Sequence, residues 1–225
     1  MDDEFIQNTS EVDIEATISD SDKPPHLIQS YFHKMKSILF EHKLYFIGMC
    51  FVFFISFIFG YLLSYSNPEY IIPILEKFAN LADFGNATPF ELFKTIFWNN
   101  TFVTIVLILF GFFFGIIPLL IIFSNGLTVG AVFEYTTREA SPIFFIVGIL
   151  PHGIIEIPII FLAGAVGFRI GLRTFLCLFK KVSFADLKKD FLNSLWVLFF
   201  FIIPMLLAAA FIEVYITAEL LKMFF

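Results

Sequence analysis

The sequence predicts an all-α fold: a polytopic bundle of about five transmembrane helices, with broken or re-entrant helices around residues 126–158. Of the 225 residues, 59% are hydrophobic and 35 are phenylalanine, whereas soluble domains contain about 45–50% apolar residues. The chain also contains several long apolar runs, and runs of about 18 residues or more indicate membrane-spanning helices. The composition therefore excludes an ordinary soluble domain.

The first element is an acidic tail, residues 1–26. Its first 22 residues hold eight acidic side chains and no Lys or Arg, so the basic start of a signal peptide is missing. We expect a disordered, solvated tail, with docking to a basic partner as the alternative. The remainder, residues 27–225, is expected to form a single membrane domain.

Three elements follow in order. Residues 27–43 have apolar side chains at helical spacing and predict an amphipathic helix on the membrane surface. Residues 44–64 are uncharged and predict the first span. Residues 67–100 predict an external amphipathic connection, in which Thr88 and Glu91 have the spacing of a capping box at the start of a helix.

The distribution of Lys and Arg predicts the later crossings. Lysines precede the first span and six basic residues lie in 169–193, whereas the 67–100 connection holds two lysines among four acids. Basic residues mark the cytoplasmic side of a cell membrane, so the N-terminus is expected inside and the C-terminus outside. The segment 125–168 must then cross twice or form a re-entrant hairpin. The remaining predicted spans are 101–123, 126–150, 152–172 and 194–220.

The predicted third and fourth spans carry ionisable residues that need shielding from lipid. Glu134 and Arg138 are four residues apart, as are His152 and Glu156, so each pair shares a helix face. A charge at bilayer depth costs about 2.5–3.5 kcal/mol on insertion scales. The cluster is either a structural knot between helices or a site for a proton, an ion or a small solute. H-x-x-x-E differs from the H-E-x-x-H metalloprotease pattern, so we predict no enzyme, metal or cofactor.

A set of motif residues carries a resemblance to a known family. The motif begins with the pair Asn125–Gly126, continues with a P-H-G-x-x-E-x-P run and ends in a small-residue span with a Gly–Arg pattern. Its further members are Pro151, His152, Gly153, Glu156, Pro158, Gly164, Gly167, Arg169 and Gly171. Over residues 95–175 the chain resembles the stage II sporulation protein M family of integral membrane proteins. The resemblance implies a multi-span protein without known catalytic activity; the founding member recruits peptidoglycan-degrading enzymes.

Some motif residues have expected physical roles. Gly164 and Gly167 would let another helix approach closely, with Gly126 and Gly130 across from them. Asn125 would cap the third span at the inner surface. Two arginines, Arg169 and Arg173, share a face that suits lipid phosphates. Farther along, Glu213 would need a partner, with His152 or Arg138 as candidates.

These features predict a non-enzymatic membrane scaffold that recruits or organises other proteins. Its contact surfaces would be the amphipathic 67–100 segment and the basic 173–193 segment. The alternative is a permease or transporter component that uses the His/Glu/Arg cluster. Expected partners are the lipid bilayer, membrane or cell-envelope proteins and a second copy of the chain. Nucleic acid is not expected, because the basic residues are few and next to the membrane.

Overall fold

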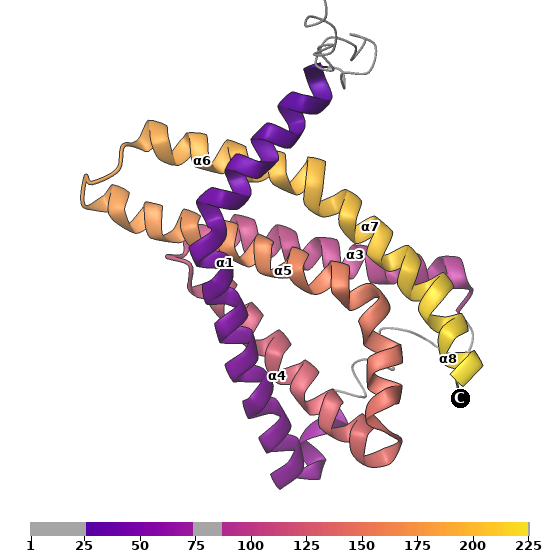
Figure 1. Cartoon of the computed structure of the whole chain (residues 1–225). Coiled ribbons are helices and arrows are strands. Elements are labelled where there is room, and N and C mark those ends of the chain that lie inside the picture. Colours follow the sequence, from indigo (N-terminus) through magenta and orange to yellow (C-terminus); the bar gives the residue numbers. More distant parts are fainter. Residues whose placement is uncertain (1–25, 74–86, 225) are drawn as a thin grey trace, which may run out of the picture. The chain divides into compact units, whose positions relative to one another are not determined.

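The computed structural model describes residues 26–73 and 87–224, and within those ranges it is helical and has no strand (Figure 1). Five helical stretches in this part of the chain are long and apolar enough to cross a membrane. They are Gln29–Ser66, Pro89–Phe112, Ile116–Glu139, Gly153–Leu178 and Phe184–Leu220. The prediction of an all-α protein with five spans is confirmed, but the boundaries of the spans differ from those expected.

The first helix, α1, is one continuous element from His26 to Ser66. The sequence led us to expect a surface helix over 27–43 and a separate span over 44–64. No proline lies between these residues, so nothing in the backbone ends the helix at residue 43. The chain divides into two compact units after Phe40, and every site described below lies in the second unit, Glu41–Phe225. The predicted acidic tail lies outside the described residues, except for His26.

The connection after α1 is short where it is described. A 3₁₀ helix, η3, covers Pro68–Ile71, and residues 74–86 lie outside the described part. Helix α3 covers Pro89–Leu109 and begins with the capping box expected from the sequence. The Thr88 backbone N–H donates to Glu91 Oε2 at 2.8 Å, and the Glu91 N–H donates to Thr88 Oγ1 at 3.3 Å. Helix α3 continues past Asn100, so the predicted boundary at residue 100 lies inside a helix, and the external location of 67–100 stays a prediction.

A turn at residues 110–115 overturns the predicted second span, 101–123. After α3 the chain forms a 3₁₀ turn, η4, over Phe110–Phe112, and Gly115 has a φ of 75°. Helix α4 then covers Ile116–Glu139. Gly111 and Gly115 both lie at this turn between two helices. A left-handed φ is readily adopted by glycine, which explains why residue 115 accommodates this turn.

The longest helix of the second unit is α5, Pro142–Leu178. Ser141 caps it by accepting a hydrogen bond from the Phe144 N–H at 3.2 Å, so the predicted span 126–150 is wrong: the chain breaks at residues 140–141. Helix α5 contains Pro151 and Pro158 and changes direction along its length, as Figure 1 shows. It contacts α3, α4, α6 and α7, and its span is the most buried of the five.

The last helical stretch consists of five consecutive elements. They are α6 (Phe184–Val197), η5 (Leu198–Ile202), α7 (Ile203–Ile212), η6 (Glu213–Thr217) and α8 (Ala218–Phe224). Both η5 and η6 are π-helical. Pro204 follows η5 closely, and the wider turn relieves the clash between a proline ring and the preceding turn. The helix therefore begins ten residues before the predicted boundary at 194.

Candidate functional site

The buried carboxylate of Glu134 has two hydrogen-bond donors. Ser64 Oγ of α1 donates to Glu134 Oε2 at 2.6 Å, and Arg138 Nε donates to Glu134 Oε1 at 3.0 Å. Only 3% of Glu134 is exposed, and Arg138 also pairs with Glu139 at 2.8 Å. The predicted Glu134–Arg138 pair is therefore confirmed. A buried carboxylate with both oxygens engaged is a stable structural element rather than an open binding group.

Glycines allow α1 and α4 to come into backbone contact beside Glu134. A Cβ atom on Gly60 would lie 2.0 Å from the Leu127 carbonyl oxygen, and one on Gly130 would lie 2.0 Å from the Phe57 carbonyl oxygen. A Cβ on Gly126 would lie 1.9 Å from Ser56 Oγ. We call this contact the α1–α4 seam. The expectation that Gly126 and Gly130 face the small residues of 163–167 is wrong, because both face α1.

The spacing of the seam residues was visible in the sequence, although the prediction missed it. Ser56, Gly60 and Ser64 follow one another at intervals of four along α1. Gly126, Gly130 and Glu134 have the same spacing on α4. Small residues at this interval make one flat helix face, which is the usual pattern for close packing of membrane helices. Two such faces in one chain were a signal that they pack together.

A second close contact joins the turn after α3 to α5. A Cβ on Gly167 would lie 1.9 Å from the Leu107 carbonyl oxygen, and one on Gly171 would lie 2.0 Å from the Gly115 backbone nitrogen. Gly164 meets the side chain of Ile122 instead. The predicted role in close backbone approach is confirmed for Gly167, whereas Gly164 packs against a side chain.

Asn125 does not cap a helix. It lies well inside α4, whose N-cap position is Gly115, and its side chain is half-buried. The prediction that Asn125 caps the third span is wrong because the helix begins earlier, at the turn that the sequence did not reveal.

The carboxyl group of Glu156 has an amide and a second acidic side chain as neighbours, unlike that of Glu134. The side chain of Asn100, on α3, lies next to the carboxyl group of Glu156 on α5. Glu213, the first residue of η6, lies close enough to Glu156 for the two carboxyl groups to interact electrostatically. We call Asn100, Glu156 and Glu213 the carboxyl pair site. Glu213 thus faces another acid, whereas the sequence led us to expect His152 or Arg138. The side chain of His152 lies outside the described residues, so its expected pairing with Glu156 stays a prediction.

An ion-pair network joins α1, α5 and α6. Arg169 Nη1 donates to Glu41 Oε2 at 2.7 Å and lies 3.3 Å from His42 Nε2. Its Nη2 lies 3.6 Å from Asp190 Oδ1, and Arg173 Nε pairs with the other oxygen of Asp190. The arginines share a helix face as expected, but carboxylates occupy the positions that the sequence led us to assign to lipid phosphates.

The motif residues Gly153 and Pro158 contact apolar side chains. Gly153 is buried, and Gly153 and Pro158 line an apolar pocket described below. Within residues 26–73 and 87–224, no three His, Cys, Asp or Glu side chains lie close enough together to hold a metal ion.

Comparison with known proteins supplies a family. The model of the family described as stage II sporulation protein M matches residues 49–218. An uncharacterised protein of Methanocaldococcus jannaschii is 30% identical over 172 residues, which cover 75% of this chain and 91% of the relative. No solved structure matches the chain.

Proposed function

The chain belongs to the stage II sporulation protein M family, and on this premise we propose that it is a non-enzymatic scaffold that holds partner proteins at the membrane. The observation that carries this proposal is a basic surface on the loop before α6 and on α6 itself. Its residues are Lys180, Lys181, Lys188 and Lys189, all exposed. We call this the lysine surface.

The lysine surface is held in place by the ion-pair network. Asp190 follows Lys189 directly and pairs with Arg169 and Arg173 on α5. Helix α6 begins at a cap in which Ser183 Oγ accepts a hydrogen bond from the Asp186 N–H at 3.1 Å. A charged surface on a fixed helix favours binding over a charged flexible tail, because less conformational entropy is lost on association. A partner with an acidic segment would complement it.

The helix contacts support a cytoplasmic location for this surface. Glu41, the sixteenth residue of α1, meets Arg169 in the second half of α5, and Ser64 near the end of α1 meets Glu134 near the end of α4. These contacts support an arrangement of five crossings that places the N-terminus and the lysine surface on one side and the C-terminus on the other. The excess of Lys on the first side favours the cytoplasm.

The test is quantitative affinity purification of the tagged protein from its native membranes. We expect partner proteins to be lost when Lys188 and Lys189 are both changed to Glu. Lys94→Glu, an exposed lysine on α3, is the charge-reversal control and should retain them. An unchanged set of partners in the Lys188/Lys189 variant, at equal yield, would contradict the scaffold proposal.

A second candidate function, a proton or small-solute permease, is favoured by the carboxyl pair site. Two carboxyl groups at membrane depth are rare and mark ion or proton pathways in other membrane proteins. The hydroxyls of Thr101, beside Asn100, and Thr217, one turn after Glu213, are buried and have no hydrogen-bond partner among the described residues. A proton-carrying water or a small polar solute bound beside the two acids would supply the hydrogen bonds that these hydroxyls lack.

Flux in liposomes separates the two functions. A pH-sensitive dye inside vesicles, with a potassium gradient and valinomycin, would report proton entry. The permease predicts flux that is lost in Glu156→Gln and Glu213→Gln and kept in the Lys188/Lys189 variant. Absence of flux with the folded wild-type protein, for protons and for a panel of small ions, eliminates this candidate and leaves the scaffold.

A further inference from the structure

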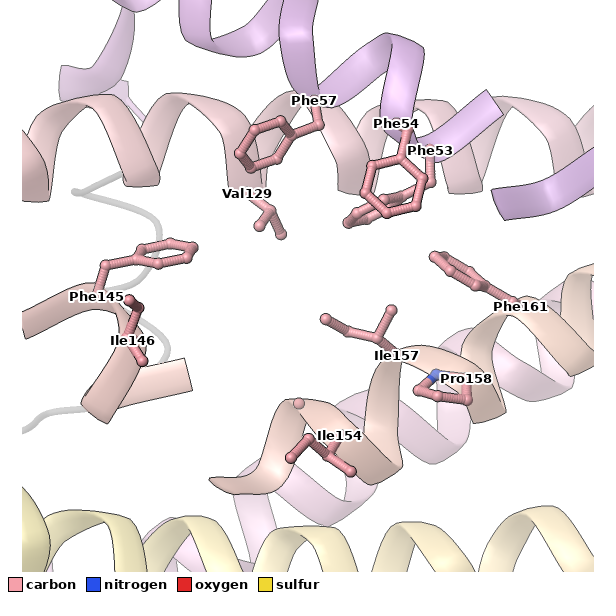
Figure 2. Close-up of a pocket in the computed structure, with 11 residues that line it drawn as sticks. Phe53, Phe54, Phe57, Val129, Phe145, Ile146, Ile154, Ile157, Pro158 and Phe161 are labelled. Atoms are coloured by element: carbon pink, nitrogen blue, oxygen red, sulfur yellow. The ribbon is translucent and has the colours of Figure 1, made fainter. Parts of the chain in front are cut away.

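An apolar pocket lies among α1, α4 and α5 (Figure 2). Its volume is about 370 Å³, within the range of pockets that bind small molecules. Phe53 and Phe57 line it from α1, Val129 from α4, and Phe145, Ile154 and Ile157 from α5. Every side chain in the wall is apolar. The pocket contains none of the polar residues discussed above and is a separate feature of the molecule.

Water cannot fill this pocket favourably. A buried water needs two to four polar partners, and the apolar side chains of the wall provide none. The lining residues on α1 and α4 fall inside two of the helical stretches long enough to span a membrane. Their surroundings there are hydrocarbon rather than water. Two residues of the wall, Phe54 and Ile154, are 62% and 63% exposed, so the pocket opens toward that hydrocarbon.

The aromatic side chains brace the wall from several helices. The rings of Phe53 and Phe161 meet with centroids 5.0 Å apart, which joins α1 to α5. Phe133 of α4 contacts Phe57 at 5.6 Å and Phe145 at 4.8 Å. Pro158 lines the pocket from within α5, the helix that changes direction. The hollow is therefore held open by packed rings and a proline-containing helix.

We propose that this pocket binds one hydrocarbon chain of a membrane lipid. A helix of about 10 Å diameter occupies roughly 400 Å³ per 5.4 Å turn, so the pocket would hold about one turn and cannot seat a spanning helix of a partner. An acyl chain is narrow, flexible and apolar along its length, and it matches a wall without hydrogen-bonding groups. Because the chain comes from hydrocarbon rather than from water, van der Waals packing against the wall would hold it, and the chain is available wherever the pocket opens.

Native mass spectrometry of the full-length protein in mild detergent tests the proposal. We expect the wild type to retain about one lipid after extensive washing. Val129→Phe fills the pocket and should reduce retention at least tenfold. Leu120→Phe is the matched control, because Leu120 is on the same helix, 57% exposed and outside the pocket wall, and it should retain the lipid. Equal retention in the two variants, or none in the wild type, overturns the proposal.

A second measurement does not depend on the folding of the filled variant. A photoreactive benzoylphenylalanine at Ile157 would be irradiated after the same wash. Cross-linking to lipid at this position, with little at Leu120, supports the bound chain. Cross-linking instead to residues 74–86 of this chain, or to another protein, shows a different occupant and overturns the proposal.

Discussion

Two acidic residues within helices long enough to span a membrane, Glu134 and Glu156, have opposite surroundings. Glu134 is enclosed at the α1–α4 seam, with a hydroxyl on one oxygen and a guanidinium on the other. Glu156 has an amide and a second carboxyl group, that of Glu213. The first arrangement balances the charge it buries, and the second places two acidic groups next to each other. A buried acid in a membrane helix is therefore assigned a structural or a functional role by its neighbours in space.

The α1–α4 seam should be most sensitive to added volume. In Gly130→Ala the new methyl group would lie 2.0 Å from a backbone oxygen of Phe57, so the helices must separate. We expect a loss of about 3 kcal/mol in unfolding free energy, at the upper end for overpacking. Thermal unfolding in detergent, followed by size-exclusion fluorescence, would measure it.

Gly48→Ala is the control for that experiment. Nothing lies within 4 Å of a Cβ at Gly48, on the same helix as Phe57. Alanine in a helix interior is favoured over glycine by up to about 1 kcal/mol, so this variant should be as stable as the wild type or more stable. Equal unfolding temperatures for the Gly130→Ala and Gly48→Ala variants would show that the seam is not tightly packed.

Removal of one donor from Glu134 should have an intermediate effect. Ser64→Ala leaves Glu134 Oε2 without its 2.6 Å hydrogen bond while the rest of the seam remains. An unsatisfied buried acceptor costs about 1–3 kcal/mol. Chemical denaturation in detergent would measure the change, with Ser66→Ala, an exposed serine on the same helix, as the control. Equal denaturation midpoints for the two variants would mean that Ser64 contributes no stabilising hydrogen bond.

The carboxyl pair site should respond least, and in the opposite direction. Glu213→Gln removes one of two adjacent acidic groups and offers an amide donor to Glu156. We expect unfolding free energy to stay constant or rise by up to about 1 kcal/mol, whereas Glu134→Gln, which loses the charge that faces Arg138, should lower it. Parallel thermal unfolding of the two variants measures the contrast. A clear loss of stability in Glu213→Gln would show that this site is as structural as Glu134.

Local features of the fold were accessible from the sequence. The number of spans, the Thr88–Glu91 capping box and the Glu134–Arg138 pair all depend on residues within one turn or one apolar run. Such features need no knowledge of the tertiary structure. The same holds for the shared face of Arg169 and Arg173, because a spacing of four residues fixes it.

Features that depend on distant residues were not accessible. The turn at Gly111–Gly115 interrupts an apolar run with no polar residue to mark it, and it packs against Gly167 and Gly171 more than fifty residues later. The partners Asp190 and Glu213 likewise come from the last helical stretch. A single sequence reveals which side chains need partners, whereas the tertiary fold decides which residues become those partners.

The two π-helical turns change the direction in which side chains of the final helical stretch point around the helix axis. Each replaces hydrogen bonds over four residues with bonds over five, so every side chain beyond it is rotated by about 100° from the position that a regular helix would give it. A helical wheel drawn through residues 184–220 would place Glu213 on the wrong side. Because a π-helical turn accommodates one extra residue, the deletion of a single residue from 198–202 would allow a regular α-helix to form there while Glu213 keeps its direction toward α5.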